Sequence, residues 1–335
     1  MDEEWEPPLP AGYNDLSRAF LQSLMARGSI TFPEGQRLLA AIKSAVSKED
    51  DDGPIDPASV TMDQFQDAIR TAREAVEPLD FDIRNTRHQS RGDGERVWAF
   101  INAHSDPMTQ LSTTRTPEEV SYIKRLLDAM FETYNTPRME VMAVDEGQAL
   151  KVSRPNRGRE SGVHEELMNG GEDGESSTQA AANRGLKHSE VLSLLSSLVE
   201  EGWLEKSREG FYSLSPRSLI ELWSWLVATY NDPDAEEEWQ HIKFCELCKE
   251  IVTYGLRCGE VSCTMRLHDM CEDGFWRTRP DKKCNKCQTP WEGNHFVGER
   301  AITSRSGFQR SRQGRRQSRP SQAQEEEEEE EEEEE

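Results

Sequence analysis

The sequence predicts a mostly α-helical chain with small β-hairpins, arranged as tandem winged-helix domains followed by a zinc finger. Two observations predict this order. A run of helices followed by a hairpin occurs near the start and recurs in the middle of the chain. All seven cysteines then fall between Cys245 and Cys287, after 244 residues that contain none. A length of 335 residues is enough for two or three ordinary domains.

The first predicted domain spans residues 12–105. Apolar residues recur at helical spacing in three segments, 14–27, 33–46 and 62–77, and Gly28 follows the first segment as a stop signal. Two runs of strand character then flank a Gly-Asp-Gly turn. Three helices followed by a β-hairpin is the order of a winged helix.

The second predicted domain spans residues 115–232 and repeats the pattern. It begins with a capping box, in which Thr116 and Glu119 close the first turn of a helix. A Gly-, Ser- and Glu-rich insert follows at about 153–182, and we expect it to be disordered. A further helix, a hairpin and a last helix capped by Ser215 complete a second winged helix with a loop inserted in it.

Winged helices often bind DNA through the helix that precedes the hairpin. Here those helices, 62–77 and 187–201, carry more acidic than basic side chains. Because a helix that binds phosphate needs clustered Lys or Arg, we expect both domains to dock proteins and any DNA contact to be weak or indirect. The basic residues of the first hairpin are either a phosphate contact or a solvated surface: Arg84, Arg87, His88, Arg91 and Arg96.

The charge of the chain is uneven. The formal net charge is −24, and eleven of the negative charges belong to the unbroken glutamate run 325–335, so the rest of the chain carries −13. We expect residues 299–335, an Arg-rich segment followed by polyglutamate, to form a disordered tail. The sequence contains no apolar run of about 18 residues, so we expect no membrane span. The acidic start does not resemble a secretory signal. A reducing compartment is therefore expected, where clustered cysteines favour metal binding over disulfides.

The cysteine-rich segment has the spacing of a zinc finger. With one histidine added, the series is Cys245-x2-Cys248-x9-Cys258-x4-Cys263-x4-His268-x2-Cys271-x12-Cys284-x2-Cys287. Eight Cys and His ligands suit two tetrahedral zinc ions and leave no cysteine over. The segment holds little apolar bulk, so we expect it to need metal to fold. The alternative is a set of buried, reduced cysteines. The order of the ligands alone permits a sequential or an interleaved arrangement.

The ligand order, four cysteines, a histidine and three cysteines, resembles RING-variant and PHD fingers. Lys282 stands where PHD fingers typically have Trp, which favours the RING variant. The chain as a whole resembles a fungal member of the non-SMC element 1 family, the RING-like subunits of the SMC 5/6 complex. The segments RVWAFINAHSDPMTQLSTTRTPEEVSYIKRLLDAMFETYNT and LVEEGWLEKSREGFYSLSPRSLIEL carry this resemblance, together with Trp291 just beyond the finger.

The resemblance implies a cross-braced C4HC3 RING-like zinc finger over residues 240–298. In that scheme the first zinc ion is held by Cys245, Cys248, His268 and Cys271. The second is held by Cys258, Cys263, Cys284 and Cys287.

The resemblance also implies a RING-type E3 ubiquitin-protein transferase, a nuclear, chromatin-associated protein that acts in DNA repair. Its implied partners are a MAGE-type winged-helix subunit, a kleisin subunit and a ubiquitin-conjugating enzyme. That enzyme would be docked by Leu247, Phe275 and Trp276, which could equally pack around the zinc loops. Asn285 and Gln288 depart from the proline and arginine of many active RINGs, so we expect activity to depend on the MAGE-type partner. The alternatives are a structural subunit without ligase activity and a PHD-type chromatin reader.

Overall fold

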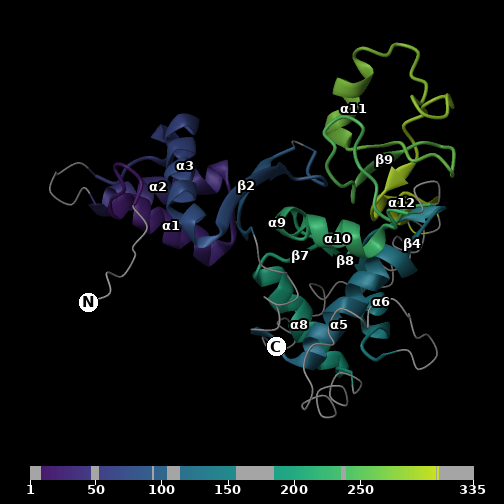
Figure 1. Ribbon diagram of the computed structural model, residues 1–335, viewed down its shortest axis with the longest axis horizontal. Coiled ribbons are helices and arrows are strands. Elements are labelled where there is room, and N and C mark those ends of the chain that lie inside the picture. Colours follow the sequence, from purple (N-terminus) through teal and green to yellow (C-terminus); the bar gives the residue numbers. More distant parts are fainter. Residues whose placement is uncertain are drawn as a thin grey trace, which may run out of the picture.

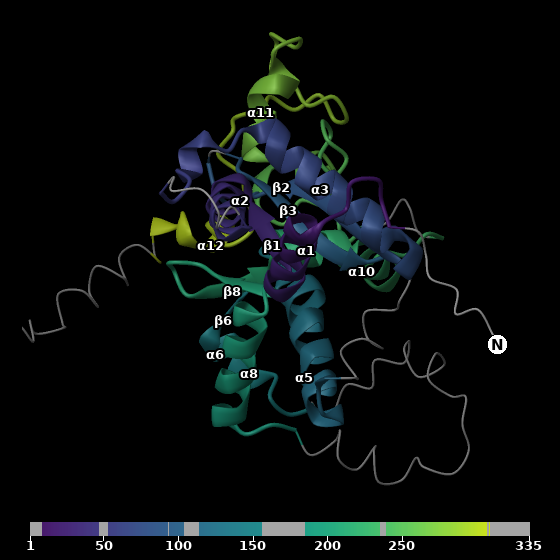
Figure 2. The same cartoon turned by 90° about the vertical axis from the view of Figure 1, so that its left-hand side faces the viewer.

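The computed structural model describes residues 9–46, 53–92, 94–103, 114–155, 185–234, 239–306 and 308. A helix-rich first unit, which ends at residue 103, lies beside a larger body formed by the rest of the described chain (Figure 1). A view turned by 90° has the first unit in front, with α11 (Asp269–Trp276) of the cysteine-rich segment above it and α5 (Pro117–Asp128) and α8 (His188–Glu200) below (Figure 2). None of the helices in these ranges is both long enough and apolar enough to cross a membrane.

The first unit consists of helices packed on a three-stranded antiparallel sheet of order β1-β3-β2. Its core is centred on Phe65, whose ring meets those of Phe20, Phe32 and Trp98 edge-on. The predicted three helices and hairpin are present, while the assignment as a winged helix stays an interpretation. The elements are α1 (Asp15–Arg27), β1 (Ser29–Thr31), α2 (Phe32–Val46), η1 (Pro57–Ser59), α3 (Met62–Val76), η2 (Glu77–Leu79), β2 (Phe81–Arg87) and β3 (Arg96–Asn102).

The middle of the chain repeats helices and a small sheet, of order β6-β8-β7. The predicted capping box at Thr116 and Glu119 is confirmed, as is the cap at Ser215. The predicted last helix is divided into two helices at Leu222, whose φ of −89° and ψ of 0° lie at the edge of the helical region. The elements are α5 (Pro117–Asp128), the π-helix η3 (Ala129–Thr133), β4 (Asn135–Thr136), β5 (Met139–Glu140), β6 (Val144–Asp145), α6 (Glu146–Lys151), α8 (His188–Glu200), β7 (Leu204–Lys206), β8 (Phe211–Leu214), α9 (Pro216–Glu221) and α10 (Trp223–Tyr230).

The cysteine-rich segment forms a third sheet, of order β10-β9-β11, with one helix of two turns. The described chain continues past the predicted end of the finger into α12, so the segment predicted as a disordered tail begins with a short helix. Its residues from 309 on lie outside the described residues, as do those of the predicted insert from 156 on. The elements are β9 (Gly255–Arg257), β10 (Arg266–Leu267), α11 (Asp269–Trp276), β11 (Phe296–Val297) and α12 (Arg300–Thr303).

The apolar interior is divided differently from the predicted domains. One cluster of buried residues belongs to the first unit alone. A second cluster runs without interruption from Tyr122 to Val297, so the middle of the chain and the cysteine-rich segment share one core. The first unit meets this larger body through its hairpin, where the backbone N–H of Asn102 donates to Glu221 of α9 at 3.4 Å. The boundaries predicted at 105, 115, 232 and 240 stay predictions.

Candidate metal centres

Two tight turns of the same kind bring together the cysteines of each CxxC pair. In the first turn, Lys249 N donates to Cys245 O at 2.9 Å, and Lys249 has the left-handed φ of 64°. In the second turn, Gln288 N donates to Cys284 O at 3.0 Å, and Gln288 has a φ of 62°. A left-handed residue after the pair reverses the chain, so both thiols of each pair face the same point.

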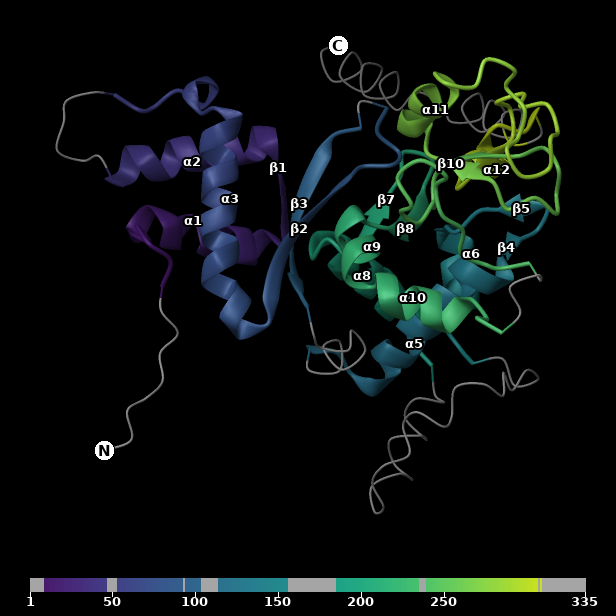
Figure 3. The ribbon, with the colours of Figure 1, turned by 45° about the horizontal axis from the view of Figure 1, so that its top comes forward.

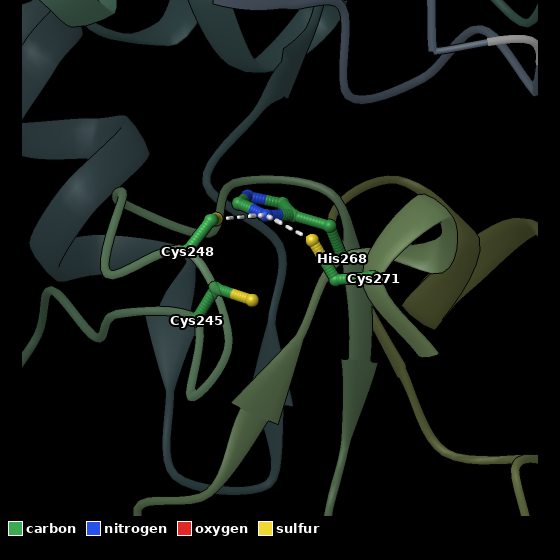
Figure 4. A group of neighbouring side chains, drawn as sticks. All are labelled: Cys245, Cys248, His268 and Cys271. Carbon is green, nitrogen blue, oxygen red and sulfur yellow. Dashed lines mark hydrogen bonds between the residues drawn. The ribbon is translucent and has the colours of Figure 1, made fainter. Parts of the chain in front are cut away.

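The first candidate centre consists of Cys245, Cys248, His268 and Cys271. His268 is the residue before α11 and Cys271 lies in the first turn of that helix, so the helix start carries half of the cluster. His268 Nδ1 lies 3.3 Å from the Sγ of Cys248 and 3.9 Å from that of Cys271 (Figure 4). The ligand atoms of all four residues lie within 4.8 Å of one another.

The second candidate centre consists of Cys258, Cys263, Cys284 and Cys287. The Sγ atoms of Cys258 and Cys287 are 3.5 Å apart, and so are those of Cys263 and Cys284. The eight residues are therefore grouped in the interleaved, cross-braced arrangement that the resemblance implied. A sequential arrangement would have placed the first four cysteines together.

The donor atoms fit zinc. A tetrahedral ion with Zn–S bonds of about 2.3 Å places two sulfur atoms about 3.8 Å apart. The four separations given above, between 3.3 and 3.9 Å, agree with such a site, and all seven cysteines are free of disulfides. Four protein ligands per ion leave no open coordination position, which is typical of structural zinc.

The second ring nitrogen of His268 is fixed by a backbone carbonyl. Its Nε2 lies 3.1 Å from the oxygen of buried Ile251. Donation of Nε2–H to this carbonyl leaves the lone pair of Nδ1 directed at the thiols, which is the usual arrangement for a metal-bound histidine.

Several of these groups hold protons when no metal does, whereas hydrogen bonds from Cys248 and Cys271 lower the pKa of Cys245. Burial raises the pKa of Cys258 to about 11. Burial also opposes the charged form of His268, but hydrogen bonds and charge from Cys245 and Cys248 outweigh it and raise the pKa of His268 to about 10. Since metal ligands must be deprotonated, binding at either centre releases protons.

A buried ionic cluster contacts the second centre through its backbone. The sequence did not predict this cluster. Glu140 of β5 accepts a 2.7 Å hydrogen bond from Arg266 Nε, and both side chains are almost fully buried. Lys243 and Arg257 lie 3.4 Å from the same carboxylate. Arg266 also donates to Cys263 O at 2.8 Å. No local signal marks Glu140 in the sequence, because its partners lie more than 100 residues away.

The three residues predicted to dock a conjugating enzyme fall into two groups. Leu247 is 48% exposed on the first CxxC turn and lies against Gly274 of α11. Phe275 and Trp276 are buried: their rings meet edge-on at 4.9 Å, and Trp276 packs on Trp291 at 5.4 Å. The exposed apolar surface at this place therefore comes from Leu247, while the two aromatic residues fill the interior.

The comparison with protein families agrees with this architecture. A family model described as "Nse1 non-SMC component of SMC5-6 complex" matches residues 17–222, and a model described as "RING-like domain" matches residues 245–287. The chain belongs to the Nse1 family. The resemblance predicted from the sequence is thereby confirmed.

Relatives of this Nse1-family chain match it along most of its length. The human "Non-structural maintenance of chromosomes element 1 homolog" is 20% identical over 277 residues, which cover 83% of this chain and 84% of the relative. The Schizosaccharomyces pombe protein is 23% identical over 237 residues, 70% of this chain and 79% of its own length. A chain of a solved "Nse1-Nse3-Nse4 complex" has a similar fold, with a TM-score of 0.59 and 19% identity over 84% of this chain and 99% of that one.

Proposed function

We propose that the chain is a RING-type E3 ubiquitin ligase subunit of the SMC 5/6 complex, acting in DNA repair on chromatin in the nucleus. The observation that carries this proposal is the cross-braced grouping of eight ligands beneath the exposed side chain of Leu247. Such a finger supplies no nucleophile. It binds the ubiquitin-conjugating enzyme and holds the charged ubiquitin so that a lysine can attack the thioester, which is catalysis by positioning.

The surface proposed for the conjugating enzyme is small and rigid. Leu247 lies between two ligands of the first centre, so its backbone is fixed on both sides. Leu247 lies against Gly274, and at the next residue along α11 the Arg279 guanidinium lies over the Phe275 ring at 4.1 Å. Zinc ions held by the eight ligands would add folding free energy to a segment whose buried residues are already part of the shared core.

The partners proposed for the first unit and the middle of the chain are a MAGE-type subunit and a kleisin subunit. The solved structure with a similar fold is a chain of a complex of three proteins. We interpret both units as winged helices that dock these proteins. On α3, Arg70 pairs with Asp67 at 2.8 Å and with Glu74 at 3.6 Å, so its charge is neutralised on its own helix. This supports protein docking over DNA reading by α3.

The alternative is a scaffold subunit of the same complex without ligase activity. Two observations favour it. The arginine of many active RINGs is replaced by Gln288, which forms the left-handed end of the second turn. Phe275 and Trp276 are buried, which leaves Leu247 with less apolar surface around it.

A ubiquitin-discharge assay, run with and without the MAGE-type partner, tests the proposal. Leu247→Ala should lower partner-stimulated discharge at least about fivefold, because truncation of an interface anchor costs more than about 1 kcal/mol. Val261→Ala is the matched control, since Val261 is 43% exposed on the loop between two ligands of the second centre. It should leave discharge unchanged.

Zinc content separates the outcomes of this assay. Both variants should retain two ions per chain, because neither residue supplies a ligand atom. If Leu247→Ala retains its zinc and discharges ubiquitin normally, the surface around Leu247 is not the binding site of the conjugating enzyme. If the wild type discharges no ubiquitin even with its partner, the scaffold alternative is correct.

A further inference from the structure

The tip of the first unit's hairpin, of which residues 88–92, 94 and 95 are described, reaches the cysteine-rich segment (Figure 3). His88 N donates to Glu95 O at 2.8 Å and closes the tip. The His88 side chain is buried, and its Nε2 donates to the Glu205 carboxylate of β7 at 2.8 Å. The tip is therefore anchored on the larger body and is not a free loop.

Gln89 uses both ends of its amide on one loop of the finger. Its Nε2 donates to Ile251 O at 2.8 Å. Its Oε1 accepts from Thr253 N at 3.0 Å, Tyr254 N at 3.2 Å and Thr253 Oγ1 at 3.2 Å. A single side chain from the first unit thus binds three backbone groups of the loop 251–254, Ile251 O, Thr253 N and Tyr254 N.

The carbonyl that Gln89 binds is the one that orients the histidine of the first centre. Ile251 O accepts from Gln89 Nε2 at 2.8 Å and faces His268 Nε2 at 3.1 Å. The opposite nitrogen of the same ring faces Cys248 and Cys271 (Figure 4). A continuous line of hydrogen bonds therefore runs from the first unit through one carbonyl to a ligand of the first centre.

A second contact from the tip reaches the same centre. Gly94, with a left-handed φ of 59°, lies so close to Met270 that an added Cβ would be 3.3 Å from its Sδ. Met270 lies between His268 and Cys271 at the start of α11. The hairpin thus approaches His268 twice, through the carbonyl of Ile251 and through Met270, two residues after the histidine.

We infer that Gln89 is a positioning residue of the first metal centre, through which the first unit controls how firmly the finger's first site is held. The inference rests on the proposed zinc centres, and it does not require ligase activity. Outer partners of metal ligands orient the ligand, and their loss typically weakens metal affinity about 10- to 100-fold. A protein that displaced the hairpin would loosen the turn that carries Leu247 without touching it.

The test measures zinc release from the full chain into an excess of a chromophoric chelator, pyridylazoresorcinol. Gln89→Ala should accelerate the release of one zinc ion per chain about tenfold and leave the other unchanged. Gln89→Glu should do the same, because it keeps the volume and the acceptor but replaces the donor to Ile251 with an oxygen. Gln64→Ala is the matched control: Gln64 is exposed on α3, where its Oε1 accepts from Lys43 Nζ at 3.0 Å, so zinc release from this variant should equal that from the wild type.

Hydrogen exchange identifies which centre is affected. The variants at Gln89 should lose amide protection in residues 245–254 and 266–271, while residues 284–291 keep theirs. Equal acceleration of both ions would mean general destabilisation, and release rates within twofold of the wild type would also overturn the inference. If the wild type does not contain two zinc ions, the proposed zinc centres are wrong and the inference about Gln89 fails with them. Lost discharge with unchanged zinc release would count against this inference and leave the proposed ligase function standing.

Discussion

Glu140 is surrounded by more positive charge than one carboxylate can neutralise. One buried carboxylate faces the guanidinium groups of Arg266 and Arg257 and also Lys243, whose pKa burial lowers to about 7, so positive charge is in excess. A zinc ion with four thiolates carries a formal charge of about −2, and Arg266 and Arg257 both donate to backbone carbonyls of the second centre's ligands. The excess cations therefore lie where a thiolate-rich centre would balance them.

Removal of the Glu140 charge should be strongly destabilising. Glu140→Gln leaves the buried cations without their carboxylate, and breaking a buried ion pair typically costs about 3–5 kcal/mol. For a body of this size we expect the melting temperature to fall by about 10 °C, as measured by calorimetry. The matched control is Glu200→Gln, which changes an exposed glutamate on α8. An equal, small shift in both variants would contradict the role given to this cluster.

Acid should erase the difference between wild type and Glu140→Gln. Burial raises the pKa of Glu140, but the hydrogen bond and charge of Arg266, with Lys243 and Arg257, outweigh burial and hold the pKa below its usual 4.5. A lowered folded pKa gives stability that is present above the unfolded pKa and is lost as the pH falls through the folded pKa. The gap between the two melting temperatures should therefore narrow below pH 4.5. A constant gap would be inconsistent with an ionised Glu140.

At the scale of elements, the ends of helices were the features easiest to predict. Side-chain caps and a left-handed glycine act within one helical turn, so neighbouring residues in the sequence are enough to predict them. Thr116, Ser215 and Gly28 all cap helices at the predicted positions. The strand β1 could not be predicted, because its three residues are stabilised by pairing with β3 about 70 residues later. The contacts of Gln89 could not be predicted either, because its partners lie more than 160 residues later in the sequence.

In the candidate site, too, local features could be predicted from the sequence and contacts between distant residues could not. Spacing predicted the eight ligands, because a CxxC turn is local, and the family resemblance supplied their grouping. Burial of Phe275 and Trp276 could not be predicted, since it depends on Trp291 and on the stacked Arg279. Exposure of an aromatic residue follows from packing partners, which its position in a motif does not specify.

The helix α3 should contribute nothing to DNA affinity. Arg70 and Arg73 are its basic residues, and they pair with Asp67 and Asp82. Arg70→Glu should therefore leave the binding of duplex DNA by the full chain within about twofold, as measured by fluorescence anisotropy at two salt concentrations. A helix that contacts phosphate would instead lose affinity steeply and show a reduced salt slope. Lys124→Glu, on α5, serves as the control for the added charge.

At the scale of the whole molecule, the shared core links metal binding to more than the finger. The cluster from Tyr122 to Val297 includes cysteines of both candidate centres. Chelation of zinc should therefore lower the melting temperature of the larger body, α5 and α8 included, while the first unit, with its separate core, stays folded. Calorimetry should resolve the two transitions, and hydrogen exchange should assign them. Loss of protection confined to residues 240–298 would contradict a shared core.

The order of synthesis gives the shared core a further consequence. The first unit is complete once residue 103 has left the ribosome, and it can fold while the rest of the chain is still being made. The cluster that includes the apolar face of α5 is not complete until Val297 has emerged about 170 residues later, which at roughly 5–20 residues per second takes about 10–30 s. During that interval, and for longer in a cell short of zinc, chaperones meet a folded amino-terminal unit joined to an incomplete apolar core.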